Sequence, residues 1–201
     1  MRHLGEGVAL TARGPIRDDA HRLGAEVTLL STVDLNLALD VVRGVEVVAV
    51  ETAAELYEAT MSRADDYDVI IMAAAVADFT LKPSPAKLKR RDGVPHLQFE
   101  PTADIIADLV ARRHADQVIV AFAAESTDVQ TNALAKLRAK GVDVLVVNDV
   151  SAPGVGFEHR TNEVTIYGRD ESATTVSLRS KEAISLAILT RVASLLSQGA
   201  Q

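Results

Sequence analysis

Cysteine is absent from this chain of 201 residues. Its absence excludes a disulfide framework, a thiolate metal site and a cysteine nucleophile, and it is typical of proteins from a reducing cytoplasm. Apolar runs are also short: none reaches the roughly 18 residues of a membrane span, and the N-terminus lacks the apolar core of a signal peptide. We therefore expect a soluble, cytoplasmic protein that does not interact with membranes.

Three common fingerprints are missing as well. The chain contains no G-x-S-x-G elbow, no Walker A loop and no G-x-G-x-x-G turn, which disfavours a hydrolase of that type, a P-loop enzyme and a Rossmann-type oxidoreductase. The net charge of −7 and the pI near 5.2 argue against a broad cationic face, so we expect no nucleic-acid partner. We also expect no protein metal site, because the five histidines lack ligand spacing: His3, His21, His96, His114 and His159.

Apolar runs of strand length alternate with segments of helical period, in a composition that is 48% hydrophobic. This alternation predicts an α/β fold of Rossmann-like type, with a mostly parallel sheet flanked by helices. We expect one domain over residues 1–201. The predicted sheet strands are 26–31, 45–50, 67–75, 117–125 and 142–149.

Helix boundaries are marked by capping residues. Thr52 followed three residues later by Glu55 forms a capping box, and Thr102 is expected to cap a second helix in the same way. A third helix is predicted to end at Gly141. Beyond the parallel core, turn residues and two alternating segments predict a β-hairpin extension over 150–178, with the look of an intersubunit arm, and then a final amphipathic helix over 181–198.

Candidate ligand-binding residues follow the predicted strands, at the sheet edge where ligands of open α/β folds bind. The stretch "MAAAVAD" would let a flat group approach the backbone, with Asp78 as an acceptor; the alternative is close helix packing and a solvated turn. Phe122 is either a stacking wall or plain core, and core is the better interpretation of its pattern alone. Lys136 and Lys140 share a helix face, either for one anion or for solvent.

A basic run, "KLKRR" from Lys87 to Arg91, lies among prolines and glycines. Such a segment cannot join the core, but it can fold over a phosphate-bearing ligand, and we expect a mobile lid over 80–96. A solvated run of charges is the competing interpretation.

Six motifs occur in an order and spacing that match one known family: "AAAVADF", "KLKRR", "TADII", "FAAES", "AKLRAKGVDVLVVNDV" and "GFEHRTNEVTIYG". Over residues 25–198 the chain resembles phosphopantothenoylcysteine synthetase, the second activity of the bacterial bifunctional coenzyme A biosynthesis protein. That family joins 4′-phosphopantothenate to cysteine, and the bacterial type uses CTP, with Mg²⁺, to form an acyl-cytidylate that the cysteine amine attacks. The resemblance also implies a homodimer.

The resemblance implies a role for each candidate residue. Lys87 matches the family lysine that turns the acyl-cytidylate over into product, and is the implied catalytic residue. The nucleotide would be held by three groups of residues: Met72, Ala73, Ala74 and Asp78 for the nucleoside; Ala103, Asp104, Ile105 and Ile106 at a helix N-terminus; and Phe122, Lys136 and Lys140 for base and triphosphate.

The chain departs from the family near its N-terminus. Family members have a glycine-rich turn like "TAGGTREPID" and a loop like "NRSSGKMG" that serves phosphate and acyl binding, whereas "VALTARGPIRDDAHRLGAEV" has no counterpart of the asparagine and both serines. A phosphate cradle needs glycines and free N–H groups, which Gly14-Pro15 supplies poorly. The sequence therefore predicts a CTP-dependent ligase, either complete, with its site completed differently, or impaired by this departure. The alternative is a non-catalytic nucleotide-binding or dimerisation module on the same fold.

Overall fold

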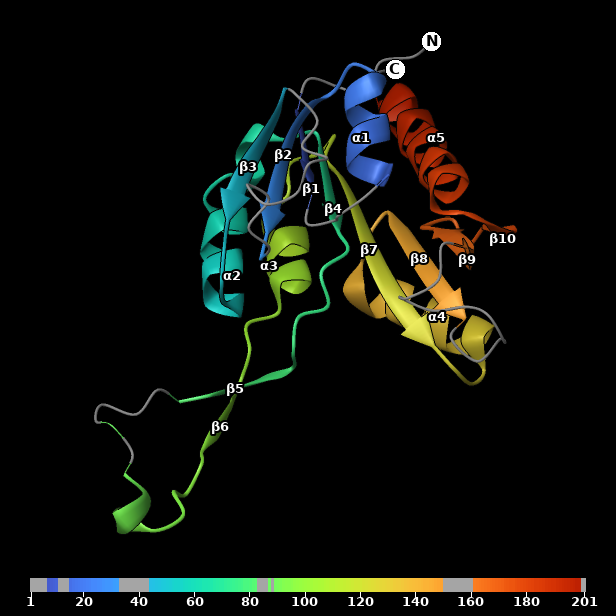
Figure 1. Cartoon of the computed structure of the whole chain (residues 1–201). Coiled ribbons are helices and arrows are strands. Elements are labelled where there is room, and N and C mark those ends of the chain that lie inside the picture. Colours follow the sequence, from blue (N-terminus) through green and yellow to red (C-terminus); the bar gives the residue numbers. More distant parts are fainter. Residues whose placement is uncertain are drawn as a thin grey trace.

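The computed structural model describes residues 7–10, 15–32, 44–82, 87, 89–149 and 161–199. A central sheet lies between two layers of helices (Figure 1). Its strand order is β10-β9-β8-β7-β4-β1-β2-β3. The strands are β1 (Gly7–Leu10), β2 (Glu26–Ser31), β3 (Val45–Ala49), β4 (Val69–Met72), β7 (Val118–Glu125), β8 (Val144–Asp149), β9 (Thr161–Gly168) and β10 (Ala173–Ser180).

Helices cover both faces of this sheet. Helices α1 (Pro15–Arg22) and α5 (Lys181–Gly199) contribute to one core cluster, while α2 (Ala53–Met61), α3 (Ile105–Arg112) and α4 (Val129–Lys140) contribute to the other. The described residues also form two short 3₁₀ turns, Ala64–Asp66 and Arg90–Asp92. The predicted α/β fold with helix-flanked parallel strands is confirmed.

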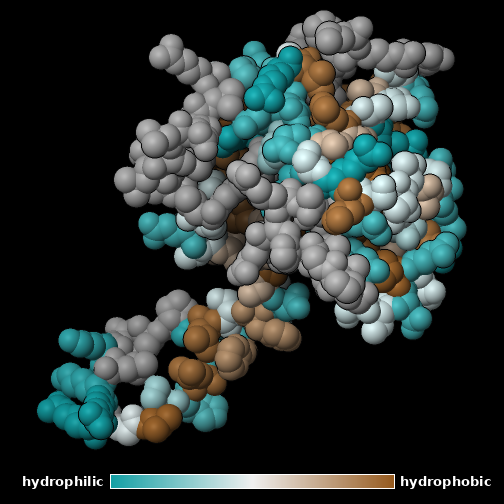
Figure 2. Space-filling view, turned by 45° about the vertical axis from the view of Figure 1, so that its right-hand side comes forward, coloured by the Kyte–Doolittle hydropathy of each residue, from teal (hydrophilic) through white to brown (hydrophobic). Residues whose placement is uncertain are grey.

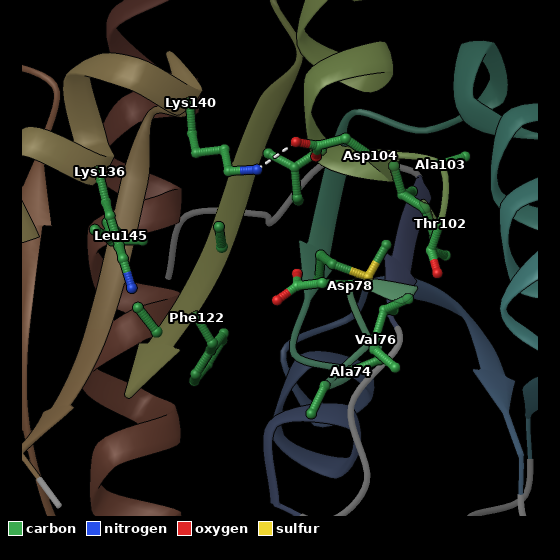
Figure 3. A pocket seen from close by; sticks show the side chains of 17 residues that line it. Ala74, Val76, Asp78, Thr102, Ala103, Asp104, Phe122, Lys136, Lys140 and Leu145 are labelled. Atoms are coloured by element: carbon green, nitrogen blue, oxygen red, sulfur yellow. Dashed lines mark hydrogen bonds and ion pairs between the residues drawn. The ribbon is translucent and has the colours of Figure 1, made fainter. Parts of the chain in front are cut away.

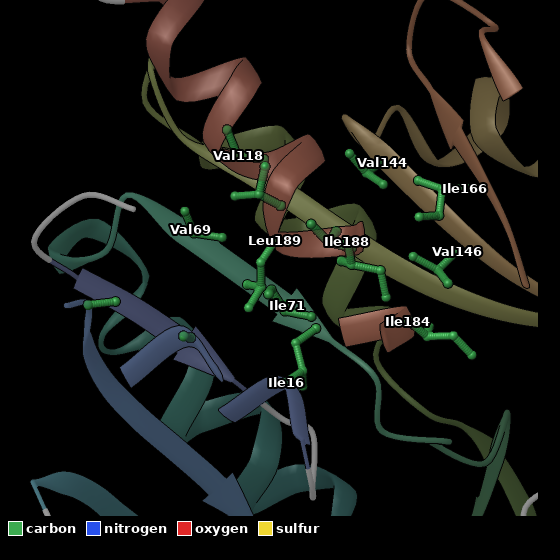
Figure 4. Close-up of a cluster of buried hydrophobic side chains, with 14 of the residues drawn as sticks. Ile16, Val69, Ile71, Val118, Val144, Val146, Ile166, Ile184, Ile188 and Leu189 are labelled. Carbon is green, nitrogen blue, oxygen red and sulfur yellow. The ribbon is translucent and has the colours of Figure 1, made fainter. Parts of the chain in front are cut away.

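Strand β4 shows how the sequence produces two cores. Its four residues are buried, and alternation directs Val69 and Ile71 to the cluster under α1 and α5, whereas Ile70 and Met72 join the cluster under the other helices. Figure 4 shows Leu189 of α5 packed over this first face. A strand that is buried on both faces appears in the sequence as a continuous apolar run, and the parallel strands were predictable for this reason.

The boundaries of the predicted strands agree with the structure to within two residues except at the end of β4. The segment 67–75 was predicted, but the ladder ends at Met72, which pairs with Ala121, and the chain then leaves the sheet. Alanine has low β-propensity, so the small residues after Met72 do little to prolong the strand.

Two helix caps agree with the sequence and one does not. Thr52 accepts a hydrogen bond from the Glu55 amide, and Gly141 ends α4 in the left-handed conformation. Thr102 does not cap α3, and its amide donates to the carbonyl of Asp78 at 2.9 Å. The helix starts at Ile105 instead, and the carboxylate of Asp104 caps it by accepting from the Ala107 amide.

The predicted hairpin is confirmed as two antiparallel strands, but it is not a separate extension. Strand β9 pairs with β8, so β9 and β10 form one edge of the main sheet, and Val164 and Ile166 join the core. The first part of the predicted segment, 150–160, lies outside the described residues. The final helix, α5, packs beside α1 as Figure 1 shows.

A second, two-stranded sheet forms a projecting arm. Strands β5 (Phe79–Leu81) and β6 (Phe99–Pro101) pair antiparallel and carry the chain away from the main body (Figure 1). We call residues 79–101 the arm; 83–86 and 88 within it are outside the described residues. Among the described helices, none combines the length and apolarity that a membrane span requires.

Candidate functional site

A pocket of about 630 Å³ opens where β4 ends. The strand order reverses between β1 and β4, and ligands of open α/β sheets bind beside such a point. Three segments form its walls: the residues that follow β4, the start of α3, and the facing parts of β7 and α4 (Figure 3). The lining residues are Met72, Ala74 to Asp78, Thr102 to Ile106, Ala121 to Ala123, Lys136, Lys140 and Leu145.

The pocket brings together all the nucleotide-binding residues expected from the sequence except Ala73. Alternation along the chain directs Ala73 to the other face, where it packs against the core under α1 and α5. Phe122 serves both interpretations made from the sequence, because it contacts that same core and also lines the pocket. The convergence comes from segments up to 68 positions apart in the chain, such as Met72 and Lys140.

Asp78 joins two of the walls. Its backbone carbonyl accepts a hydrogen bond from the Thr102 amide, which fastens the segment after β4 to the segment before α3. Its side chain is exposed and is directed into the pocket in Figure 3. A carboxylate in that position can accept hydrogen bonds from the hydroxyl or amino groups of a bound nucleoside.

The start of α3 is less open to anions than the sequence suggested. Burial by itself raises the pKa of Asp104, but the hydrogen bond from Lys140, the amides of Ala107 and Ile106 and the charge of Lys140 outweigh it, so the pKa lies below its ordinary value. These two amides, which would otherwise face a ligand, already donate to the aspartate. The ion pair of Lys140 with Asp104 spans the pocket from α4 to α3 (Figure 3).

Lys136 has a carboxylate partner that sequence reasoning missed. Its ammonium group forms an ion pair with Glu125, the last residue of β7, although the contact lacks the geometry of a hydrogen bond. The signal that would have found Glu125 is its place at the carboxyl end of a buried strand. Thr102 was missed as a lining residue because it was assigned to a helix cap; its hydroxyl is buried without a hydrogen-bond partner.

Lys87 is not brought to the pocket. It is exposed on the arm, which projects away from the sheet, and it is not among the lining residues. None of the described residues of the segment 80–96 lines the pocket. The expected catalytic lysine and the expected nucleotide site are separate here.

The structure is consistent with the N-terminal departure seen in the sequence. Strand β1 ends at Leu10 and α1 begins at Pro15, so only four residues connect them. So short a connection has no room for both a glycine-rich turn and a loop with an asparagine and two serines.

Two carboxylates of the pocket, those of Asp78 and Asp104, have the chemistry to contact a magnesium ion. Mg²⁺ commonly uses one or two carboxylates together with phosphate oxygens and water, not a full protein cage. Within the described residues, no group of three or more His, Cys, Asp or Glu side chains is arranged to hold a metal. The donor set thus fits an ion that arrives with a phosphate ligand.

Residues 14–196 match the model of a protein family described as the DNA/pantothenate metabolism flavoprotein C-terminal domain. The chain belongs to this family. A solved structure of a family domain, the C-terminal domain of coenzyme A biosynthesis bifunctional protein CoaBC, superimposes with a TM-score of 0.78 at 28% identity, covering 96% of this chain and 97% of that one. The family domain and the present fold therefore correspond over nearly their whole lengths.

Two curated relatives match over a similar segment. CoaBC of Bacillus subtilis strain 168 is 39% identical over 185 residues, which cover 91% of this chain and 45% of the relative. A cysteine/cysteine sulfinic acid decarboxylase from an unknown prokaryotic organism is 37% identical over 182 residues, which cover 90% of this chain and 50% of the relative. The chain spans about half the length of these relatives. Since their names differ in activity, the names alone do not assign a reaction to the shared segment.

Proposed function

We propose that this domain binds CTP in the pocket between α3 and α4 and uses it to ligate 4′-phosphopantothenate to cysteine in coenzyme A biosynthesis. The observation that carries the proposal is the convergence of Asp78, Phe122, Lys136 and Lys140 on one pocket at the carboxyl end of β4, beside the topological switch of the sheet. The similarity to the CoaBC C-terminal domain over nearly its whole length supports the same assignment. We expect the protein to act in the cytoplasm.

In the proposed reaction, a carboxylate oxygen of 4′-phosphopantothenate attacks the α-phosphorus of CTP, and pyrophosphate leaves. The cysteine amine then attacks the acyl carbonyl; a C–N bond forms, CMP leaves and the amine loses a proton. Asp78 would accept hydrogen bonds from the nucleoside, Phe122 would contact the base, and Lys136 and Lys140 would attract the phosphates. Mg²⁺ bound to the triphosphate would neutralise part of its charge.

Lys87 is proposed to act on the second step, when movement of the arm brings its ammonium group to the reacting acyl phosphate. Negative charge grows there on the carbonyl oxygen and on the departing phosphate, and an ammonium group that contacts it only then lowers the barrier without adding to ground-state binding. Lys87→Gln should therefore leave CTP affinity nearly unchanged but slow amide formation by several orders of magnitude. The neighbouring exposed lysine provides the control, and Lys89→Gln should retain activity.

We also propose a homodimer that uses the arm. Phe79, Leu81 and Phe99 lie on one face of the two-stranded sheet, and the two phenylalanines are 62% and 67% exposed. Figure 2 shows hydrophobic side chains along the arm and hydrophilic ones toward its tip. The arm has five basic and two acidic side chains, a net charge of +3 in a chain of −7, which leaves −10 for the body. A second copy thus offers both charge complementarity and cover for the apolar face.

One specific observation favours the second candidate, a nucleotide-binding module without ligase activity. The four-residue connection between β1 and α1 leaves no room for the phosphate-binding loop. A domain lacking that loop could bind CTP through Asp78 and the pocket lysines and yet form no acyl-cytidylate.

Two measurements test the proposal. Thermal unfolding with CTP, ATP, GTP or NADH should show the largest shift with CTP, and a ligand at about 100 times its Kd adds roughly 2.7 kcal/mol to stability. Equal shifts with CTP and ATP would refute the base specificity. Mass spectrometry of a single-turnover mixture with 4′-phosphopantothenate and cysteine should then show pyrophosphate, acyl-cytidylate and product; CTP binding without any of these would establish the binding module instead.

A further inference from the structure

The charges of the pocket do not match a polyphosphate ligand as they stand. The charged side chains in its lining are Asp78, Asp104, Lys136 and Lys140, so positive and negative charges balance. Moreover, each lysine is paired with a carboxylate: Lys140 with Asp104 and Lys136 with Glu125. Among the described lining residues, no ammonium group is left without an anionic partner. A triphosphate can enter only if these pairs change.

The two side chains of the Lys136–Glu125 ion pair differ in how freely they can move. The Glu125 side chain is 11% exposed at the end of β7, and its Oε1 atom is buried with no partner apart from the ion pair. The Lys136 side chain is 50% exposed on α4 and has a four-carbon stem that can redirect its ammonium group. The lysine is therefore the member that can exchange its partner.

We propose that Glu125 and Asp104 are internal counter-ions that hold Lys136 and Lys140 at the pocket wall until a polyphosphate displaces them. This inference deepens the proposed function, since it concerns how the same pocket selects its ligand. A triphosphate carries several negative charges and attracts each ammonium group more strongly than one carboxylate does, whereas a monophosphate has a smaller advantage. The two ion pairs thus raise the negative charge that a ligand needs in order to bind.

The same arrangement favours release of the monophosphate product. When Lys136 leaves Glu125, a buried carboxylate oxygen loses its only partner, which is costly in a site shielded from water. That cost is offset while a polyphosphate holds the lysine, and it drives the lysine back to Glu125 once only CMP remains. Glu125 does not line the pocket, so it acts as a positioning residue through Lys136.

The test uses inorganic tripolyphosphate, CTP, CMP and cytidine as probes in isothermal titration calorimetry. Glu125→Gln removes the counter-ion while keeping the side-chain shape, so tripolyphosphate and CTP should bind several-fold more tightly, CMP should gain as well, and cytidine should be unchanged. The matched control is Glu171→Gln, which removes an exposed ion pair with Arg138 on the same helix but away from the pocket. It should change none of these affinities.

Two further variants show whether the effect passes through the lysines. In Glu125→Gln/Lys136→Met, tripolyphosphate affinity should equal that of Lys136→Met alone. Asp104→Asn removes the carboxylate that pairs with Lys140, so it should also tighten tripolyphosphate binding. The helix should remain intact, because asparagine is also a favoured capping residue. Melting without ligand identifies any variant that fails to fold.

The inference is overturned if Glu125→Gln binds tripolyphosphate no better than Glu171→Gln does, or if the double variant keeps the gain. The inference and the proposed function can be refuted independently of each other. Equal affinity for CTP and ATP would refute the cytidine specificity but leave the counter-ion exchange standing, whereas an unchanged tripolyphosphate affinity would refute the exchange even in an active ligase.

Discussion

At the scale of single residues, the backbone and the side chain of Asp78 have separate roles. The backbone carbonyl holds Thr102, while the carboxylate is exposed toward the pocket. Asp78→Ala should therefore preserve the fold but weaken CTP binding by about 1 to 3 kcal/mol, because a hydrogen bond to a charged acceptor is lost. Calorimetric titration measures this, with Asp116→Ala in an exposed turn as control. An unchanged CTP affinity would show that Asp78 is only a turn residue.

The lowered pKa of Asp104 predicts an acid-sensitive contribution to stability. A carboxyl group whose pKa is lower in the folded state stabilises the fold above its unfolded pKa, near 4, and loses that contribution as pH falls through the folded pKa. The free energy of unfolding should therefore drop on acidification below about pH 4 by more in the wild type than in Asp104→Asn. Urea titrations at pH 5 and pH 3 measure the difference, and equal drops would contradict it.

At the scale of elements, Asp143 ties three segments together just before β8. Its carboxylate accepts hydrogen bonds from Arg113, after α3, and from the Ile119 amide of β7, both at 2.9 Å, and it pairs with Arg169 in the turn after β9. The side chain of Asp143 is only 16% exposed. Asp143→Ala therefore removes the acceptor of Arg113 and of the Ile119 amide, whereas Arg169 keeps the Gly141 carbonyl as an acceptor.

We expect Asp143→Ala to lower the free energy of unfolding by about 1 to 3 kcal/mol. Equilibrium urea denaturation provides the measurement. Glu171→Ala removes an ion pair between exposed side chains and should have a much smaller effect. Equal losses in the two variants would show that the burial of Asp143 contributes nothing.

The elements also show where local signals suffice. Thr52 was predicted as a cap correctly, because the Thr52–Glu55 pattern and the start of α2 depend on neighbouring residues alone. The cap predicted at Thr102 was wrong: Ile105, not a glutamate, stands three residues later, and the Thr102 amide binds the carbonyl of Asp78, which is 24 positions away in the sequence. The carboxylate of Asp104, also a favoured capping residue, caps α3 instead, and the helix starts at Ile105.

At the scale of the whole molecule, the proposed dimer predicts which apolar surface matters. A two-stranded hairpin is only marginally stable in water, and the exposed phenylalanines of the arm need cover. Phe99→Asp should convert the dimer to a monomer in light scattering after size exclusion. The control is Leu178→Asp in β10, an edge strand of the main sheet, because Leu178 is similarly exposed. Dissociation by Leu178→Asp alone would assign the interface to the β9–β10 hairpin.

The sequence by itself determined the order of the strands predicted for the main sheet, and all but one of the nucleotide-binding residues that it named line the pocket. Both depend on signals that are local or repeated at the carboxyl ends of successive strands: apolar runs, capping residues, and small or polar residues after each run. Tertiary structure alone decided that β9 and β10 complete the main sheet, that the arm carries Lys87 away from the pocket, and that each pocket lysine is paired with a carboxylate. Lys136 and Glu125 are 11 positions apart on different elements, and only the packing of α4 against β7 brings their charges together.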